Sequence, residues 1–318
     1  MRVTVTGGAG FIGSNLVGTL VRTPGITAVQ VIDDLSTGFR ANLDPYPQVR
    51  LHEGSILDAA LLREVFTTTD AVIHLAARPS VPRSISDPVA SHEANATGTL
   101  RVLEAAREAG GLHTVVASSS SVYGGNPTLP KSEDLKAEPL SPYAVSKLAA
   151  ETYALAYATC FELPVLPFRF FNVFGPGQPA GHAYAAVVPA FIDAAMQGVP
   201  IPRHGDGEQS RDFTYVGTVA DVLTRAVLGR VTSDTAVNLA FGSRRTINDV
   251  IDELGRQLDI PLAIAQLPDR AGDVRHSQAD QRRLLSLFPD VAPVPFETGL
   301  AATIDWFRAR MPATVGVA

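Results

Sequence analysis

The N-terminal segment, residues 2–14, constrains the fold more than any other part of the chain. It reads RVTVTGGAGFIGS: a short alternating apolar run, then Gly7, Gly10 and Gly13, then an apolar pattern of helical period that continues to Val21. This order predicts a strand, a tight glycine turn and a helix. Glycines at this spacing permit a sharp turn, a close approach of the backbone to a pyrophosphate, and close packing of the helix on the strand.

The next predicted strand supports a dinucleotide site rather than a bare structural turn. It covers residues 28–32 (AVQVI) and leads directly into Asp33, twenty residues after Gly13. A carboxylate at this place suits the two hydroxyls of an adenosine ribose and repels a 2′-phosphate, which favours NAD over NADP. The N-terminus of the predicted helix offers free N–H groups to a phosphate. We therefore predict an NAD site here.

The composition describes an ordinary globular protein of 318 residues with a net charge of −6. There is no basic stripe for nucleic acid and no apolar run of about 20 residues for a membrane, so we expect neither partner and a cytoplasmic location. The single cysteine, Cys160, excludes an internal disulfide, and its apolar helical surroundings predict a buried side chain. The histidines show no metal-ligand spacing, which predicts no metal.

Strands and helices alternate along the first part of the chain. Strands are predicted at residues 28–32, 49–52, 71–77, 115–118 and 164–172, helices near 58–66, 88–109 and 142–161, and a loop at 34–43. Alternation at this spacing predicts an α/β fold with a doubly wound parallel sheet, which binds its ligands at the carboxyl ends of the strands.

The pattern changes after Asn172, where proline and glycine become frequent and the predicted helices shorten. We predict an NAD-binding Rossmann domain over residues 1–172. A smaller α/β domain that binds the substrate is predicted over residues 173–318, with residues 213–241 as a stretch that can return to the first domain.

Tyr143 and Lys147 are the first candidates for chemistry. They stand four residues apart at the start of the helix SPYAVSKLAAE, which puts them on one face with Cβ atoms roughly 5–6 Å apart. A cation so close predicts a tyrosine pKa lowered from about 10 toward a value useful for a general base. Ser119, Ser120 and Ser121 follow a predicted strand, where a hydroxyl can bind a substrate oxygen. The alternatives are an ordinary surface pair and a solvated serine turn.

Eight segments in this order give the chain a family resemblance. They are TGGAGFIGS, HLAA, NATGT, SSSSVYG, YAVSK, RFFNVFGPG, GDGEQSRDFTYV and RAGDVRHSQAD. Together they resemble the extended short-chain dehydrogenase/reductase superfamily, and within it the nucleotide-sugar 4-epimerases related to UDP-galactose 4-epimerase. The resemblance covers essentially the whole chain.

The resemblance implies roles for particular residues. Tyr143 is the expected base, Lys147 tunes it and holds the nicotinamide ribose, and Ser119 bridges to the sugar O4. The residues expected to bind NAD are Gly7, Gly10, Phe11, Ile12, Gly13, Asp33, Ser55, Ile56, Leu75, Ala76, Ala77, Tyr143 and Lys147. Those expected to bind the UDP-sugar are Ser119, Ser120, Tyr143, Asn172, Arg211, Arg270, Asp273 and Ser277. Arg211 and Arg270 would grip the pyrophosphate, and Asp273 the uridine ribose.

Two positions depart from the family pattern. Ser55 stands where many relatives have an aspartate that holds the adenine amino group, and the segment NLAFG (residues 238–242) replaces a form with more glycine. The first departure predicts a weaker adenine contact or one supplied by the backbone; the second has no explanation from the sequence.

The resulting hypothesis is an isomerase that oxidises the sugar at C4 and reduces it again on the opposite face. Dehydratases and decarboxylases of this kind carry carboxylates where this chain has Ser120 and Ser121. A uronic-acid epimerase, disfavoured by Asn172, a dehydrogenase, and a non-catalytic NAD-sensing protein are the remaining alternatives. In the resembling epimerases the position four residues after Asp273 faces the C2 substituent of the sugar, so Ser277 in place of a bulky tyrosine implies room for an acetamido group. The apolar circumference of the helix at 148–161 predicts a homodimer.

Overall fold

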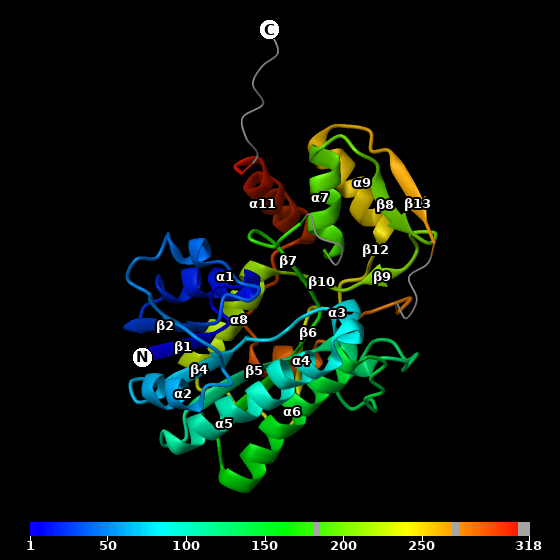
Figure 1. Ribbon diagram of the computed structural model, residues 1–318. Helices are drawn as coiled ribbons and strands as arrows, with labels where there is room; N and C mark the ends of the chain where they lie inside the picture. Colours follow the sequence, from blue (N-terminus) through cyan, green and yellow to red (C-terminus); the bar gives the residue numbers. More distant parts are fainter. Residues whose placement is uncertain (181–184, 269–273, 311–318) are drawn as a thin grey trace.

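The computed structural model describes residues 1–180, 185–268 and 274–310, and within them the chain forms a large parallel sheet with helices on both faces (Figure 1). The main sheet contains β1 (Arg2–Thr6), β2 (Ala28–Asp33), β3 (Arg50–Glu53), β4 (Ala71–His74), β5 (His113–Ser119), β6 (Val165–Phe170) and β11 (Val237–Leu239). These lie in the order β11-β6-β5-β4-β1-β2-β3, and each strand is parallel to its neighbours. The predicted doubly wound α/β fold is confirmed.

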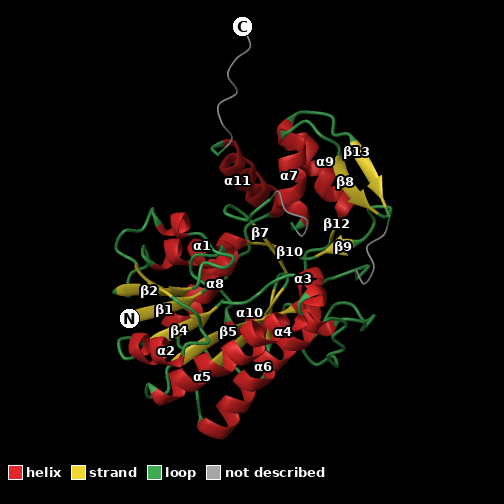
Figure 2. Ribbon diagram, in the orientation of Figure 1, coloured by secondary structure: helices red, strands yellow, loops and turns green. Residues whose placement is uncertain are grey.

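Helices cover both faces of this sheet (Figure 2). One face carries α1 (Phe11–Leu20) and α8 (Val216–Leu228), which pack together over β1, β4 and β5. The other face carries α2 (Ala59–Phe66), α5 (Gly98–Glu108) and α6 (Pro142–Phe161). The central strands β4, β5 and β6 are buried along almost their whole length, as expected for a parallel sheet that is covered on both faces.

Further helices and short strands complete the described part of the chain. The helices are α3 (Val81–Ser86), α4 (Pro88–His92), α7 (Val187–Met196), α9 (Ile247–Leu258), α10 (Arg282–Leu287) and α11 (Phe296–Arg308). Two 3₁₀ helices cover Arg40–Leu43 and Ser120–Tyr123, and a π-helical turn covers Glu93–Thr97. Short strands pair as β7 (Asn172–Phe174) with β10 (Phe213–Tyr215), β9 (Ser210–Arg211) with β12 (Arg245–Thr246), and β8 (Ile201–His204) with β13 (Ile264–Leu267).

A second hydrophobic core lies among α7, α9 and α11, above the carboxyl ends of the main sheet in Figure 1. Its centre is aromatic: the ring of Phe174 lies 5.0 Å from that of Phe296 and 6.1 Å from that of Phe213. All three rings are buried. This core forms the smaller α/β part, and it contains β7, which directly follows β6 of the main sheet. We propose the boundary between the two domains at this strand.

The glycine turn after β1 has the tight geometry that its sequence predicts. Gly7 adopts φ +73°, and a Cβ there would lie 2.7 Å from the backbone nitrogen of Ala76. A Cβ on Gly13 would lie 2.1 Å from the carbonyl oxygen of Gly7 and 2.6 Å from Cα of Gly8. Both distances are shorter than atomic contact allows, so glycine at these positions lets the first helix and the chain after β4 close on the turn.

Helix 88–109 of the sequence prediction is interrupted in the structure. It divides into α4, the π turn Glu93–Thr97 and α5. The helix is interrupted here because the side chains of Asn95 and Thr99 bond to backbone groups: Asn95 Oδ1 accepts from the N–H of Arg78, and Thr99 Oγ1 donates to the carbonyl oxygen of Asn95. A preceding helix, α3, was missed by the sequence analysis. The sequence signal for this helix is its N-terminal cap. Ser80 accepts a hydrogen bond from the N–H of Arg83, and Pro82 occupies the first turn.

Some predicted elements differ from the observed ones by more than two residues or in kind. β4 ends at His74 rather than at residue 77, because its partner β1 ends at Thr6 where the glycine turn begins. The predicted strand 164–172 divides into β6 and β7, which pair with different sheets. The predicted loop 34–43 contains the 3₁₀ helix Arg40–Leu43.

Cys160 is exposed, and the prediction of a buried side chain was wrong. The sequence around it is apolar, but α6 presents part of its apolar surface outward. Val145, Tyr153 and Phe161 on this helix are 50%, 41% and 51% exposed. Within the described residues, none of the helices has the length and apolar character needed to cross a bilayer.

We predict that Gly13→Ala lowers the free energy of unfolding by more than about 2 kcal/mol, because the new methyl group would collide with rigid backbone. Alanine in an unhindered helix would instead stabilise by about 1 kcal/mol. Gly125→Ala is the control, since its Cβ would meet only the side chain of Leu140 at 3.6 Å. Urea denaturation measures both, and equal stability of the two variants would contradict the prediction.

Candidate functional site

The first group of candidate residues gathers at the carboxyl end of β5. Ser119 ends this strand and caps the 3₁₀ helix Ser120–Tyr123, and its Oγ accepts a hydrogen bond from the N–H of Ser121 at 3.2 Å. Tyr143 enters the same place from the first turn of α6. That helix begins here because Ser141 caps it, with its Oγ accepting from the N–H of Ala144 at 3.2 Å, and Pro142 follows as its first residue.

Lys147 lies one turn further along α6 and is 5% exposed. Its Nζ donates a hydrogen bond to the carbonyl oxygen of Ala117 on β5 at 2.8 Å. Burial lowers the pKa of Lys147 to about 8. The structure thus brings Ser119, Tyr143 and Lys147 together at one strand end.

The tyrosine pKa moves opposite to the sequence prediction. Burial raises the pKa of Tyr143, and the hydrogen bond with the side chain of Ser119 lowers it by a smaller amount. The expected lowering by Lys147 was wrong for this arrangement, because loss of water around the phenol disfavours its charged form more than its neighbours stabilise that form. Helical spacing alone could not reveal how far the side chain is removed from water.

A chain of buried polar side chains that the sequence analysis missed lies behind this group. His74 at the end of β4 contacts Thr6 Oγ1 through Nδ1 at 2.7 Å and Thr99 Oγ1 through Nε2 at 2.9 Å. Its side chain is 2% exposed, and burial lowers its pKa to about 3. It is therefore neutral at physiological pH and acts as a fixed hydrogen-bonding bridge between the end of β1 and α5.

The π turn continues this polar contact to α6. Asn95 is fully buried; its Nδ2 donates to Ser146 Oγ at 2.9 Å, and Ser146 Oγ donates to the carbonyl oxygen of Tyr143 at 2.8 Å. Its Oδ1 also accepts from the N–H of Arg78 at 2.7 Å. A buried asparagine and threonine inside an otherwise helical pattern are the sequence signal that could have indicated this contact.

The glycine turn meets the requirements for holding the pyrophosphate of NAD. Gly10 precedes α1 without a side-chain cap, and the first turn of this helix contains no acidic residue. The N–H groups of Phe11, Ile12 and Gly13 in that turn have no intrahelical partners, as at any helix start. Together with the helix dipole they favour an anion. The residues present therefore fit a bound diphosphate.

Asp33 lies at the carboxyl end of β2 beside this turn. Its Oδ2 accepts from the N–H of Ala9 at 2.8 Å and its Oδ1 from that of Leu35 at 2.9 Å. Burial raises the pKa of Asp33, and these two hydrogen bonds lower it by less. Each carboxylate oxygen has further acceptor capacity, which suits ribose hydroxyls.

The other predicted NAD residues line the same sheet edge. Ile56 is buried against Gly98, where an added Cβ would lie 2.4 Å from its Cδ1. The Oγ of Ser55 accepts a hydrogen bond from the N–H of Leu57 at 3.2 Å. Leu75, Ala76 and Ala77 follow β4 and are partly buried beside Gly7.

Three predicted substrate residues converge on the short strands. Asn172 begins β7 and is exposed, and it pairs with Phe213 of β10. Arg211 lies on β9, and its Nη1 donates to the carbonyl oxygen of Ser210 at 2.9 Å. Ser277 donates its N–H to that same carbonyl at 3.0 Å. Ser120 lies in the 3₁₀ helix after β5, and Arg270 and Asp273 fall outside the described residues.

Further charged groups surround β9 that the sequence analysis did not identify. Arg244 donates through Nε to Ser210 Oγ at 2.9 Å, and its Nη2 lies 3.3 Å from His276 Nδ1. Burial lowers the pKa of His276, and the positive charges of Arg244, Arg275 and Arg211 lower it further. This end of the site is therefore electropositive, as binding of an anionic nucleotide requires.

Asp212 is a buried carboxyl next to this cluster. It accepts from the N–H of Ala279 at 3.0 Å and from Ser243 Oγ at 3.2 Å. Burial raises the pKa of Asp212 to about 6. It ties the strand of Arg211 to the segment that follows Ser277.

Comparison with known proteins agrees with this arrangement. The model of the NAD dependent epimerase/dehydratase family matches residues 3–240. The chain is 35% identical over 317 residues to a UDP-glucose 4-epimerase from Mycolicibacterium smegmatis, covering 98% of this chain and 99% of that protein.

Solved structures are similar over almost the whole chain. One is a UDP-N-acetylglucosamine 4-epimerase from Methanobrevibacter ruminantium in complex with UDP-N-acetylmuramic acid, with a TM-score of 0.91, 35% identity, and coverage of 98% of this chain and 99% of that one. Another is a dTDP-glucose 4,6-dehydratase from Streptomyces venezuelae with NAD bound, with a TM-score of 0.89, 32% identity and 98% coverage of both chains.

We predict that His74 makes stability depend on pH. The unfolded chain takes up a proton at His74 near pH 6.5, whereas the folded pKa is about 3, so stability falls as the pH falls below 6.5. The loss at pH 5 is about 2 kcal/mol. His74→Gln should reduce the slope of unfolding free energy against pH by about one proton between pH 5 and 6.5. Urea denaturation at several pH values measures this slope, and an unchanged slope would contradict the assignment.

Proposed function

This chain belongs to the NAD dependent epimerase/dehydratase family, whose cofactor is NAD, and we propose that within it the protein is a UDP-hexose 4-epimerase. The observation that carries the proposal is the meeting of Ser119, Tyr143 and Lys147 at the carboxyl end of β5. These are a hydroxyl donor, an acid–base group and a buried cation. They suit reversible proton transfer at a sugar hydroxyl.

Different residues around this site would bind different parts of NAD. The first turn of α1 would hold the pyrophosphate, Asp33 the adenosine ribose and Lys147 the nicotinamide ribose. NAD when bound supplies a hydride acceptor that returns the hydride later. The chain itself needs to orient the sugar and move one proton.

Tyr143 is the group that moves this proton. It would accept the proton of the C4 hydroxyl as the 4-keto sugar forms and return it after the sugar has turned, so that the other epimer results. Ser119 would hold the C4 oxygen beside the phenol, and the two side chains already share a hydrogen bond. To accept this proton Tyr143 must be ionised; burial opposes the ionised form, and the hydrogen bond with the side chain of Ser119 favours it.

Ser120 and Ser121 support an epimerase over a dehydratase. They occupy the start of the 3₁₀ helix where a dehydratase would need an additional acid and base beside the sugar. A hydroxyl group remains neutral near neutral pH and does not replace a carboxylate in water elimination. A dehydratase or a uronic-acid epimerase is the second candidate, since a dehydratase is among the similar structures.

The test of this proposal is incubation of the purified protein with UDP-glucose and with UDP-N-acetylglucosamine, separately and without added NAD, followed by resolution of the epimers. We expect the C4 epimer from each and NAD released from the denatured protein. Strict dependence on added NAD with stoichiometric reduction would indicate a dehydrogenase. A product lacking one water would indicate a dehydratase.

Tyr143→Phe should lower turnover by about 10²–10⁴-fold because the proton acceptor is lost. The fold and the NAD content should remain, since the ring stays in place. Tyr153→Phe makes the same chemical change on the exposed side of α6, where the side chain is 41% exposed, and should leave turnover unchanged. If Tyr143→Phe retains most of its activity, the base is another residue.

Ser277 is the proposed gate for the sugar C2 substituent. It is partly buried next to Ser210, and a serine leaves space where a tyrosine would fill it. We propose that UDP-N-acetylglucosamine and UDP-N-acetylgalactosamine are interconverted, as well as UDP-glucose and UDP-galactose. A similar structure is a UDP-N-acetylglucosamine 4-epimerase, and a similar curated protein is a UDP-glucose 4-epimerase.

Replacing Ser277 by Tyr should abolish turnover of the acetamido pair and spare the plain hexoses, because only the larger substituent needs the space. Steady-state kinetics on both pairs provide the measurement. An equal loss on both pairs, or no effect on either, would show that this residue is not the gate.

We propose a homodimer through the outer surface of α6 and the neighbouring α4. Val145, Tyr153 and Phe161 of α6 and Val89 of α4 leave an apolar surface, with Val89 67% exposed. Light scattering should give the mass of a dimer, and Tyr153→Arg should shift the equilibrium toward a monomer. A wild-type monomer in dilute solution would refute this interface.

A further inference from the structure

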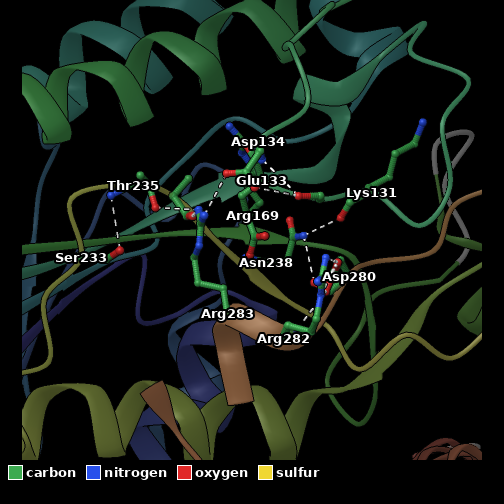
Figure 3. Close-up of polar contacts among 12 residues, drawn as sticks. Lys131, Glu133, Asp134, Arg169, Ser233, Thr235, Asn238, Asp280, Arg282 and Arg283 are labelled. Atoms are coloured by element: carbon green, nitrogen blue, oxygen red, sulfur yellow. Dashed lines mark hydrogen bonds and ion pairs between the residues drawn. The ribbon is translucent and has the colours of Figure 1, made fainter. Parts of the chain in front are cut away.

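Asn238 begins the NLAFG segment that the sequence left without an explanation. It lies on β11, directly opposite Arg169 of β6, and its side chain is fully buried. Figure 3 shows it among polar groups that come from separate parts of the chain. A buried amide at a fixed place in a parallel sheet needs partners for every polar atom.

Both ends of the Asn238 amide have hydrogen-bond partners, three in all. Its Nδ2 donates to the carbonyl oxygens of Lys131 at 2.7 Å and Asp280 at 3.2 Å, and its Oδ1 accepts from the hydroxyl of Tyr123 at 2.7 Å. A primary amide has two N–H donors, and both are used here. The pattern of partners also fixes the orientation of the amide, because its nitrogen must face the two carbonyls.

The first contact holds the segment that follows Ser277. Lys131 donates its N–H to the carbonyl oxygen of Gln278 at 2.7 Å and accepts from the N–H of Asp280 at 2.9 Å. Asn238 therefore binds both chains of this short pairing at their carbonyl groups. Ser277 itself is tied to Ser210 at the adjacent end.

The second contact holds the turn that follows Ser119. Tyr123 is the last residue of the 3₁₀ helix that Ser119 caps, and its ring is 1% exposed. The guanidinium carbon of Arg169 lies 4.7 Å from the centre of that ring. Burial raises the pKa of Tyr123 to about 12, so its hydroxyl remains a donor toward Asn238.

Arg169 is in turn held by α6, the helix that carries Tyr143 and Lys147. Its Nε and Nη2 donate to the two carboxylate oxygens of Glu151 on α6 at 3.0 and 2.7 Å. Glu151 also accepts from Ser118 Oγ on β5 at 2.7 Å. The tyrosine ring thus packs on a cation that is itself held by an ion pair, and the tyrosine hydroxyl adds the contact with Asn238.

We propose that Asn238 is a positioning residue that fixes the segment after Ser277 and the turn after Ser119 relative to one another, with Tyr123 as its link to the turn. The inference rests on the proposed function, in which Ser277 faces the sugar and Ser119 holds its C4 oxygen. A single buried amide then sets the distance between the recognition of the sugar and the chemistry at C4.

The two halves of this link are separable by mutation. Tyr123→Phe removes the hydroxyl and keeps the ring on Arg169, so only the turn after Ser119 should loosen. We expect kcat to fall about tenfold, with the KM for either UDP-sugar changed by less than about threefold. Asn238→Asp places an oxygen against the two carbonyls, so both segments should loosen, with a lower kcat and a KM raised about tenfold or more.

The matched control is Tyr157→Phe, which removes a tyrosine hydroxyl that donates to Glu104 on the other side of α6. It should leave kcat and KM within about twofold of the wild type. The double variant Tyr123→Phe/Asn238→Asp should be no slower than Asn238→Asp alone, because both act through one hydrogen bond. Additive losses would overturn the link between the two residues.

Hydrogen–deuterium exchange tests the same inference independently of catalysis. Tyr123→Phe should raise exchange in residues 119–123, Asn238→Asp should raise it in residues 119–123 and 276–280, and Tyr157→Phe in neither. Unchanged exchange in residues 119–123 of Tyr123→Phe would overturn the inference whatever the enzyme does. Failure of the wild type to interconvert epimers would overturn the proposed function instead.

Discussion

The rest of the structure depends on the close approach of the turn after β1 to the chain after β4. Gly7 lies so close to Ala76 that no side chain fits between them, and Gly13 packs on the carbonyl group of Gly7. This contact brings the first helix, the ends of β1 and β4 and the buried His74 close together. In the function that we propose, the NAD pyrophosphate and the serines that face the sugar share one sheet edge, and this compact backbone makes that arrangement possible.

Much of the fold could be predicted from sequence because the sheet is buried on both faces and its strands are apolar runs between glycine and proline. Helix α6 was predicted at its observed bounds, since Ser141 and Pro142 mark its start. The π turn, the separate strand β7 and the exposure of Cys160 could not be, because they depend on which neighbour covers each surface. Apolar composition indicates that a surface needs covering without indicating what covers it.

The placement of Tyr143 and Lys147 could be predicted from the sequence, but the electrostatics around them could not. Spacing placed Tyr143 and Lys147 on one face, and the structure brings both to the end of β5. The direction of the Tyr143 pKa depends on how much water the folded site excludes, which no spacing encodes. Arg211, Arg244 and Arg275 come from segments far apart in sequence, so their convergence appears only once the chain is folded.

The order of the strands also affects how the chain folds while it is being synthesised. β11 completes the edge of the main sheet beside β6, yet the chain between them, residues 171–236, contains β7 to β10 and the whole of α8. A nascent chain that has emerged as far as β6 therefore exposes an unpaired parallel edge until residue 239 leaves the ribosome. At about 5–20 residues per second this edge remains open for several seconds. During that interval the β6 edge is open to pairing with a strand of another chain.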